Sequence, residues 1–127
     1  MPAGGLQGKN LDSPDETRSF DNGRMDVVGL GGGVTVGRAV FEPGWKWPEA
    51  VKPIAQTESC LVPHVGYVFS GRMKVVMDDG MEGEFGPNDA LVIPPGHDAW
   101  TVGDDPCVVL DFAGADEYAT GVRSLGV

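Results

Sequence analysis

Glycine and proline interrupt this chain so often that little room remains for long helices. Its 127 residues include 20 glycines and 10 prolines, spread along the whole length. Short apolar runs lie between them, such as the alternating segment 34–41, which is followed by Glu42-Pro43-Gly44. Runs of this kind are typical of brief strands joined by turns. The sequence therefore predicts an all-β sandwich or barrel in one domain, because a chain of this length has room for one core.

The second half of the chain is predicted to continue this pattern. Further strands are expected at 61–69, 73–77, 83–85, 90–93, 98–102 and 108–112. The beginning differs, because residues 1–15 are rich in glycine, asparagine, aspartate and serine and have little to bury. We therefore expect a flexible N-terminal arm at 1–15 and a barrel domain at 16–127. The tail at 115–122 is a candidate for a short helix.

The charge of the chain restricts its partners. The formal net charge is −10 and the pI is near 4.3, which argues against nucleic-acid binding, since that affinity depends on clustered lysine and arginine. No apolar stretch approaches the ~20 residues that a membrane span requires. The segment Met1–Lys9 also lacks the apolar core of a signal peptide. We expect a cytoplasmic protein without membrane contacts, in which Cys60 and Cys107 are free thiols.

Two segments resemble the paired motifs of the cupin family. Tyr67–Gly71 is similar to the end of the first motif, and Asn88–Gly96 is similar to the second. The resemblance covers residues 36–112 and implies a double-stranded β-helix, or jelly-roll, barrel. Cupins include isomerases, oxygenases, cyclases, storage proteins and sugar-binding regulators. The resemblance alone therefore leaves the function open.

The first motif also implies where metal ligands lie. In the family it reads H-x-H, three or four residues, E, six residues, G. Counting back from Gly71 places the glutamate position at His64 and the two histidine positions at Glu58 and Cys60. The spacing is therefore kept while the ligand types are permuted.

The second motif usually reads G, five residues, P-x-G, two residues, H. Asn88 stands in place of the first glycine, which is a mild change because asparagine tolerates the left-handed region. Pro94 and Gly96 match, but the histidine position falls on Ala99. His97 lies two residues earlier, so strand alternation keeps it on the same face.

The chemistry of these residues supports a metal site independently. Positions 58, 60 and 64 share a parity, so on one regular strand all three side chains would point into the barrel. Glu58, Cys60 and His64, joined by His97, would suit zinc, iron(II) or copper rather than magnesium or calcium. The alternative is that Cys60 is a small buried hydrophobe, His64 hydrogen-bonds within the barrel and Glu58 lies in water.

Four further residues are candidates for substrate contacts. Arg38 would enter the barrel and hold a substrate carboxylate if its face of segment 34–41 points inward, although a salt bridge at the rim is the favoured alternative. Trp47 is expected at the mouth of the barrel. Tyr67 and Trp100 are also candidates, but such residues more often belong to a core or a subunit interface.

Two classes of function follow. In the first, the protein is a small metalloenzyme in which Cys60, His64 and His97 hold the ion. Glu58 then completes the ligand set or serves with His64 as a catalytic acid or base, in an oxygenation, an isomerisation or related proton chemistry. In the second, the barrel binds or carries a small molecule without a metal. The resemblance and the aromatic face implied by Tyr67 and Trp100 also suggest a homodimer.

Overall fold

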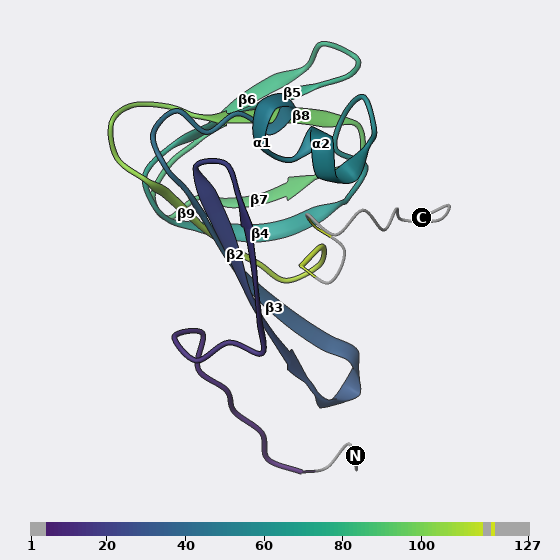
Figure 1. Cartoon of the computed structure of the whole chain (residues 1–127), viewed down its shortest axis with the longest axis vertical. Coiled ribbons are helices and arrows are strands. Elements are labelled where there is room, and N and C mark those ends of the chain that lie inside the picture. The colour runs from purple at the N-terminus through teal and green to yellow at the C-terminus, as the bar shows by residue number, and fades with distance from the viewer. Residues whose placement is uncertain (1–4, 116–117, 119–127) are drawn as a thin grey trace.

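Two antiparallel β-sheets form the body of the protein in the computed structural model, which describes residues 5–115 and 118 (Figure 1). The larger sheet has the strand order β1-β2-β3-β9-β4-β7 and the smaller one the order β6-β5-β8. The larger sheet consists of β1 (Glu16–Phe20), β2 (Gly23–Leu30), β3 (Val34–Phe41), β4 (His64–Ser70), β7 (Ala90–Ile93) and β9 (Cys107–Asp111). The smaller consists of β5 (Met73–Met77), β6 (Glu82–Phe85) and β8 (His97–Thr101).

Strand alternation explains where the core lies. Buried positions recur every second residue in β7, β8 and β9, so one face of each strand points between the sheets. Aromatic rings fill part of this space, with Phe41 stacked on Trp45 at a centroid distance of 4.0 Å. Cys60 and Cys107 are both buried free thiols, as expected. The all-β fold predicted from the glycine, proline and strand pattern is confirmed.

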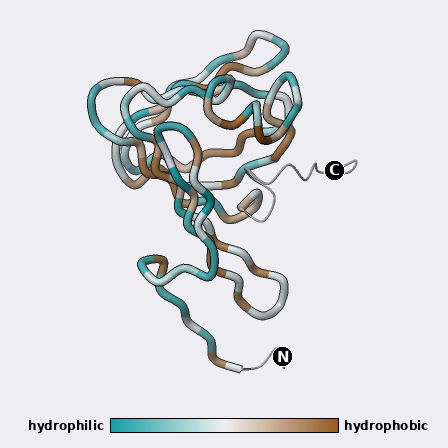
Figure 2. Tube along the Cα trace, in the orientation of Figure 1, coloured by the Kyte–Doolittle hydropathy of each residue, from teal (hydrophilic) through white to brown (hydrophobic). Residues whose placement is uncertain are grey.

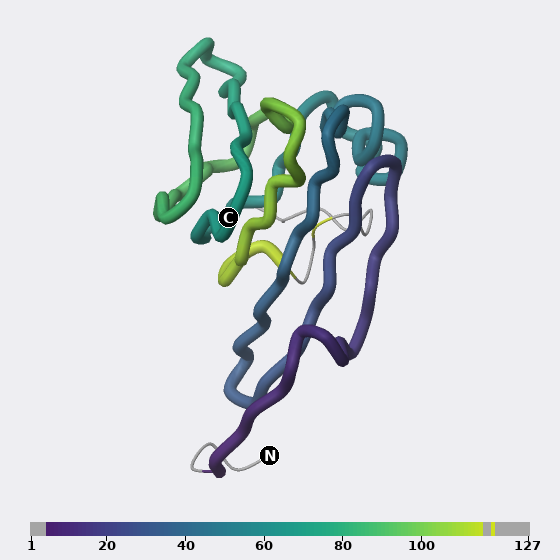
Figure 3. The backbone as a smooth tube through the Cα atoms, turned by 90° about the vertical axis from the view of Figure 1, so that its left-hand side faces the viewer, coloured from purple at the N-terminus to yellow at the C-terminus, as the bar shows by residue number. Residues whose placement is uncertain are grey.

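The hairpin of β2 and β3 extends beyond the rest of the barrel, and the N-terminal segment runs beside it (Figures 1 and 3). The segment is mostly hydrophilic along its length (Figure 2). Hydrogen bonds tie it to β2 and the hairpin turn: the amide of Asp15 donates to the carbonyl of Val27 at 2.9 Å, and Gln7 accepts from the amide of Gly31 at 2.7 Å. This part of residues 1–15 is therefore docked on the hairpin through polar contacts.

Several boundaries differ from the expectation. The strand predicted at 61–69 begins only at His64, and β1 and β2 were not predicted. Two short helices, α1 (Trp47–Ala50) and α2 (Lys52–Ala55), and one 3₁₀ turn, η1 (Gly31–Gly33), replace expected loop. Each short α-helix has a proline in its first turn, where the missing N–H removes no helical hydrogen bond.

The candidate C-terminal helix at 115–122 lies largely outside the described residues. No helix in the described part of the chain is long and apolar enough to span a membrane.

Candidate metal centre

Cys60, His64 and His97 converge at one end of the barrel. Each offers one ligand atom, and these atoms all lie within 4.8 Å of one another. Sγ of Cys60 is 3.8 Å from Nε2 of His64, and the two imidazole centroids are 5.2 Å apart. Residues from the two cupin-like motifs are thus brought to one point. Donors around one tetrahedral ion lie about 3.3–3.8 Å apart, so small side-chain movements of about 1 Å would let the three atoms share an ion.

Backbone pairing places the thiol beside His97. Cys60 lies before β4 and forms an isolated bridge with His97, the first residue of β8. The amide of Cys60 donates to the carbonyl of His97 at 2.7 Å, and the amide of His97 donates back at 3.2 Å. His64 is the first residue of β4, in the opposite sheet. The cluster therefore joins the two sheets where β4 and β8 begin.

Hydrogen bonds fix the orientation of both imidazoles. Nδ1 of His64 lies 2.5 Å from Oδ2 of Asp111, and Nδ1 of His97 lies 2.8 Å from the carbonyl of Pro94. Because both partners are acceptors, each Nδ1 carries a proton, which leaves Nε2 as the atom of each ring that can bind a metal once that atom is deprotonated. Asp111 is itself held, since its Oδ1 accepts from the amides of Ala113 and Gly114 at 3.0 Å each. Both rings are thus preset as Nε2 ligands.

The ionisation of the cluster follows from these contacts. Burial alone would raise the pKa of the Cys60 thiol, but hydrogen bonds and charges from His64 and His97 lower this pKa to about 6. Burial alone would lower the pKa of His64, but Asp111 and Cys60 raise it to about 9. Burial raises the pKa of Cys107, which has no such partner, to about 11. The geometry therefore favours a thiolate at position 60 alone.

A cavity between the sheets adjoins the cluster. His64 and His97 line it, and so does Asp111, while the rest of its wall is almost entirely apolar and aromatic. Its free space is about 40 Å³, which is more than one water molecule requires. Among the described residues Cys60 is not part of the wall. The cavity is therefore lined by the two imidazoles and not by the sulfur.

Glu58 does not join the cluster, contrary to the expectation that it is a ligand or a catalytic group. Residues 58–63 do not form a regular strand, so the shared parity of positions 58, 60 and 64 does not determine where their side chains point. The Glu58 side chain is 96% exposed and pairs with Lys52 at 3.0 Å. Glu58 is therefore a loop carboxylate in water, as the alternative to a ligand role predicts.

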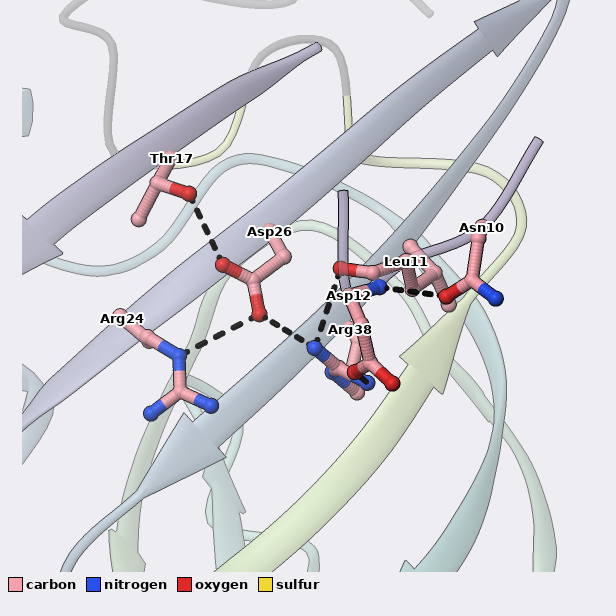
Figure 4. A network of polar contacts seen from close by, with 7 residues as sticks. All are labelled: Asn10, Leu11, Asp12, Thr17, Arg24, Asp26 and Arg38. Atoms are coloured by element: carbon pink, nitrogen blue, oxygen red, sulfur yellow. Dashed lines mark hydrogen bonds and ion pairs between the residues drawn. The ribbon is translucent and has the colours of Figure 1, made fainter. Parts of the chain in front are cut away.

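Arg38 lies on the outer face of β3, so it does not enter the barrel. Its guanidinium donates to Asp26 at 2.9 Å and to Asp12 at 2.8 Å (Figure 4). Asp26 is buried, and it also accepts from Thr17 and Arg24. Arg38 therefore forms salt bridges, which was the favoured alternative to a substrate contact. The reason is that the inward face of β3 carries the odd-numbered residues 39 and 41, which line the cavity.

The three aromatic candidates divide between inside and outside. Trp47 is buried and lines the cavity, as part of α1. Tyr67 points away from the cavity and its hydroxyl hydrogen-bonds Asn88. Trp100 lies between the buried residues Ala99 and Thr101 on β8, so alternation places it on the opposite face. Of these three candidates, only Trp47 can therefore contact a ligand inside the barrel.

Two residues near the histidines were missed by the sequence reasoning. Asp111 could have been found, because it shares the inward parity of Val109 in a predicted strand and an inward aspartate needs a partner. Tyr118 had no comparable signal, since it follows the last strand. It is buried, lines the cavity and packs its ring 5.4 Å from that of His64.

Comparisons with known proteins identify the fold. No protein-family model matches the chain, and no curated protein matches it. Among solved structures, it is similar to an RmlC-like cupin from Shewanella frigidimarina, with 17% identity, a TM-score of 0.58, and coverage of 89% of this chain and 95% of that one. It is also similar to the polyketide cyclase RemF from Streptomyces resistomycificus, with 18% identity, a TM-score of 0.62, and coverage of 87% and 80%.

A third similar structure is KdgF from a Halomonas species, with 18% identity, a TM-score of 0.55, and coverage of 78% of this chain and 87% of that one. These likenesses confirm that the chain has the cupin fold, as the paired motifs implied. At such identities the likeness concerns the fold, and function has to be argued from the site.

Proposed function

We propose that this protein is a metal-dependent cupin enzyme that acts on a small molecule in the cavity. In this proposal Cys60, His64 and His97 bind one transition-metal ion. The observation that carries it is the convergence of the three ligand atoms within 4.8 Å, with both Nδ1 atoms already engaged. Because each Nδ1 atom is engaged, Nε2 is the atom of each imidazole that remains to bind an ion.

The donor set suits a transition metal. A thiolate and two neutral imidazoles match zinc, iron(II) or copper, whereas magnesium and calcium prefer oxygen ligands. Three protein ligands with a free position are typical of catalytic rather than structural zinc sites. When bound, such an ion supplies Lewis-acid chemistry or lowers the pKa of a coordinated water. The described residues offer three ligands at this point, so the free position is available to water or substrate.

The protein's own residues have distinct tasks in this proposal. Asp111 holds the Nδ1 proton of His64 and thereby directs Nε2 away from β9. The carbonyl of Pro94 does the same for His97. The aromatic and apolar wall excludes water from the cavity and strengthens the electrostatic interactions inside it.

A second candidate function uses Cys60 as a nucleophile. Cys60, His64 and Asp111 form a chain of thiol, imidazole and carboxylate, in which each group orients the next. The position of the sulfur counts against this candidate, because Cys60 is not among the described residues that line the cavity. Alkylation by iodoacetamide with and without metal distinguishes the two functions, since a bound ion would protect Cys60 if it is a ligand and would leave the reaction rate unchanged if it is a free nucleophile.

The proposal is tested by the metal content of protein purified without a histidine tag and incubated with zinc, iron(II) or copper in turn. We expect about one ion per chain in the parent for at least one metal, and loss of that ion in Cys60→Ala, His64→Ala and His97→Ala. Cys107→Ala is the control for removing a buried thiol, and Glu58→Gln is the control for removing an exposed charge two residues before Cys60. Both controls should keep the metal.

Two results would overturn the metal site. One is a parent that binds none of the three metals stoichiometrically. The other is a Cys60→Ala variant that binds as tightly as the parent. Either result would leave a barrel that binds a small molecule without a metal.

A further inference from the structure

We propose that the cavity holds its ligand through an oxygen acceptor group, a carboxylate or a carbonyl, that accepts hydrogen bonds from Trp45, Trp47 and Tyr118. This inference names the substrate class for the site of the proposed function and rests on that function for the role of the ligand. The binding itself does not require the metal.

Three side chains that carry an unpaired buried donor line this one cavity. Among the described residues, four buried side-chain nitrogen or oxygen atoms have no hydrogen-bond partner. Three of them are Nε1 of Trp45, Nε1 of Trp47 and the hydroxyl of Tyr118, and all three residues line the cavity. The fourth belongs to Arg38, which lies on the outer face of the sheet. Because a buried donor without a partner costs free energy, three at one cavity indicate an acceptor that the protein itself does not supply.

Packing prevents these groups from finding partners by moving. Trp45 and Trp47 are each 1% exposed and Tyr118 is 3% exposed. The Trp45 ring stacks on Phe41, and the Tyr118 ring has edge contacts with both Phe41 and Phe20. Rings held in this way keep their polar atoms in fixed positions. The donors are therefore set in place before any ligand arrives.

The chemistry of the wall selects the ligand's polar group. An indole N–H can only donate, and a phenol can donate or accept. The acceptors nearby are already engaged, since Asp111 binds His64 and two amides. A ligand that only donates, such as an ammonium group, would leave both indole N–H groups unpaired, since among these three side chains only the Tyr118 oxygen could accept from it. A ligand oxygen would satisfy the unpaired donors.

The apolar part of the cavity wall determines what the rest of the ligand can be. Apart from the histidines and Asp111, the wall carries apolar side chains such as Met73, Leu91 and Ile93. The free space of about 40 Å³ restricts the buried part to a few non-hydrogen atoms. The ligand class is therefore a small organic acid or carbonyl compound with an apolar body.

The indole N–H signals of ¹⁵N-labelled protein provide the test. The chain has three tryptophans, so the signals are assigned with Trp45→Phe, Trp47→Phe and Trp100→Phe. Acetate and acetone are titrated separately, to distinguish a carboxylate from a carbonyl, and ethylammonium serves as a donor of similar size. We expect acetate or acetone to shift the Trp45 and Trp47 signals saturably. The Trp100 signal, from the outer face, should not move, and ethylammonium should move none of the three.

Tyr118→Phe gives a second, independent readout. The variant removes only the hydroxyl, so we expect the dissociation constant of acetate or acetone to rise about threefold to tenfold. Without ligand, the variant should be at least as stable as the parent in urea, because a buried hydroxyl without a partner has been removed. Tyr67→Phe is the matched control, since its hydroxyl lies outside the cavity, and it should leave the affinity unchanged.

The inference is wrong if the three indole signals shift together without saturation, or if neither acetate nor acetone moves them. It is also wrong if Tyr118→Phe and both cavity tryptophan variants bind as tightly as the parent. A Tyr118→Phe variant that is less stable than the parent without ligand would show that water already satisfies the hydroxyl, which also contradicts it.

Each titration is made on zinc-loaded and on EDTA-treated protein. If zinc does not bind but acetate or acetone still shifts the cavity signals, the metal proposal fails and this inference stands. If zinc binds stoichiometrically but no ligand shifts the signals, this inference fails alone.

Discussion

His64 and Asp111 are joined across the neighbouring strands β4 and β9, with Nδ1 of the imidazole 2.5 Å from Oδ2 of the carboxylate. The carboxylate is buried, and its other oxygen is held by the amides of Ala113 and Gly114. A buried carboxylate behind a histidine fixes the ring and raises the basicity of its free nitrogen. Because β4 and β9 are neighbours in the larger sheet, this sheet fixes the position of the His64 ring.

Asp111→Asn should weaken metal binding while leaving the three ligands in place. The amide can keep its bonds to the two backbone N–H groups, but it loses the charge that supports His64. Loss of such a partner typically lowers metal affinity by about 10-fold to 100-fold. Zinc affinity measured by competition with a chelator checks this prediction. Asp105→Asn, in an exposed loop, is the control, and an Asp111→Asn variant with the parent's affinity would contradict the role assigned to Asp111.

The stability of the metal-free protein should change little between pH 6.5 and pH 9. The pKa of His64 is raised to about 9, so its contribution is full below pH 6.5 and is lost as the pH rises through 9. The pKa of Cys60 is lowered from 9.0 to about 6, so its contribution is present above pH 9 and is lost as the pH falls through 6. Between pH 6.5 and pH 9 the stability lost from His64 is therefore offset by the stability gained from Cys60.

Cys60→Ser should reveal how the stability contributed by His64 depends on pH. Without the thiolate, the free energy of unfolding should fall by about 1–2 kcal/mol between pH 6.5 and pH 9, because one unit of pKa shift corresponds to about 1.4 kcal/mol. Urea unfolding of EDTA-treated protein at a series of pH values checks it. Cys107→Ser should retain the flat profile of the parent. A flat profile in Cys60→Ser would show that His64 does not gain its proton in the folded state.

Gly71→Ala should destabilise the barrel strongly. Gly71 has φ of +75°, and an added Cβ would lie 2.1 Å from the carbonyl oxygen of Pro106. Gly80 also has a positive φ, of +93°, but an added Cβ there has no neighbour within 4 Å. We expect Gly80→Ala to cost about 1 kcal/mol for strain and Gly71→Ala about 3 kcal/mol, because the close approach adds to the strain. Equal losses in urea unfolding would contradict the close approach.

Arg38→Met should reduce stability without affecting the cavity. The substitution removes the guanidinium that faces buried Asp26, leaving Thr17 and Arg24 as partners, and should cost about 1–3 kcal/mol. Metal content and acetate binding should be unchanged. Lys9→Met, which removes an exposed ion pair, should have little effect on stability. An Arg38→Met variant of normal stability with weaker ligand binding would restore Arg38 as a substrate contact.

The second cupin-like motif was informative because its residues are dictated by local backbone geometry. Asn88 stands where the motif has glycine and adopts φ of +73°, as the tolerance of asparagine for this region implies. Strands β5 and β7 have the predicted bounds for a similar local reason, since turn residues enclose short apolar runs. The helices α1 and α2 escaped prediction because four-residue helices have too few residues for a periodic pattern.

The candidate site could be predicted only in part. Cys60 and His64 were found by motif spacing and His97 by strand alternation, and the structure brings the three together. Glu58 was included by the same spacing, but parity predicts direction only within a regular strand, and residues 58–63 do not form one. The contact between Cys60 and His97 depends on pairing between distant segments, which spacing within one motif does not describe.

The ligand environment of bound zinc tests the central claim most directly. X-ray absorption at the zinc edge measures the type and distance of the atoms around the ion. A site formed by Cys60, His64 and His97 predicts one sulfur at about 2.3 Å and two imidazole nitrogens at about 2.0–2.1 Å, with the sulfur lost in Cys60→Ala. A spectrum of the parent that contains only nitrogen and oxygen neighbours, or one that is the same in Cys60→Ala, would contradict the account.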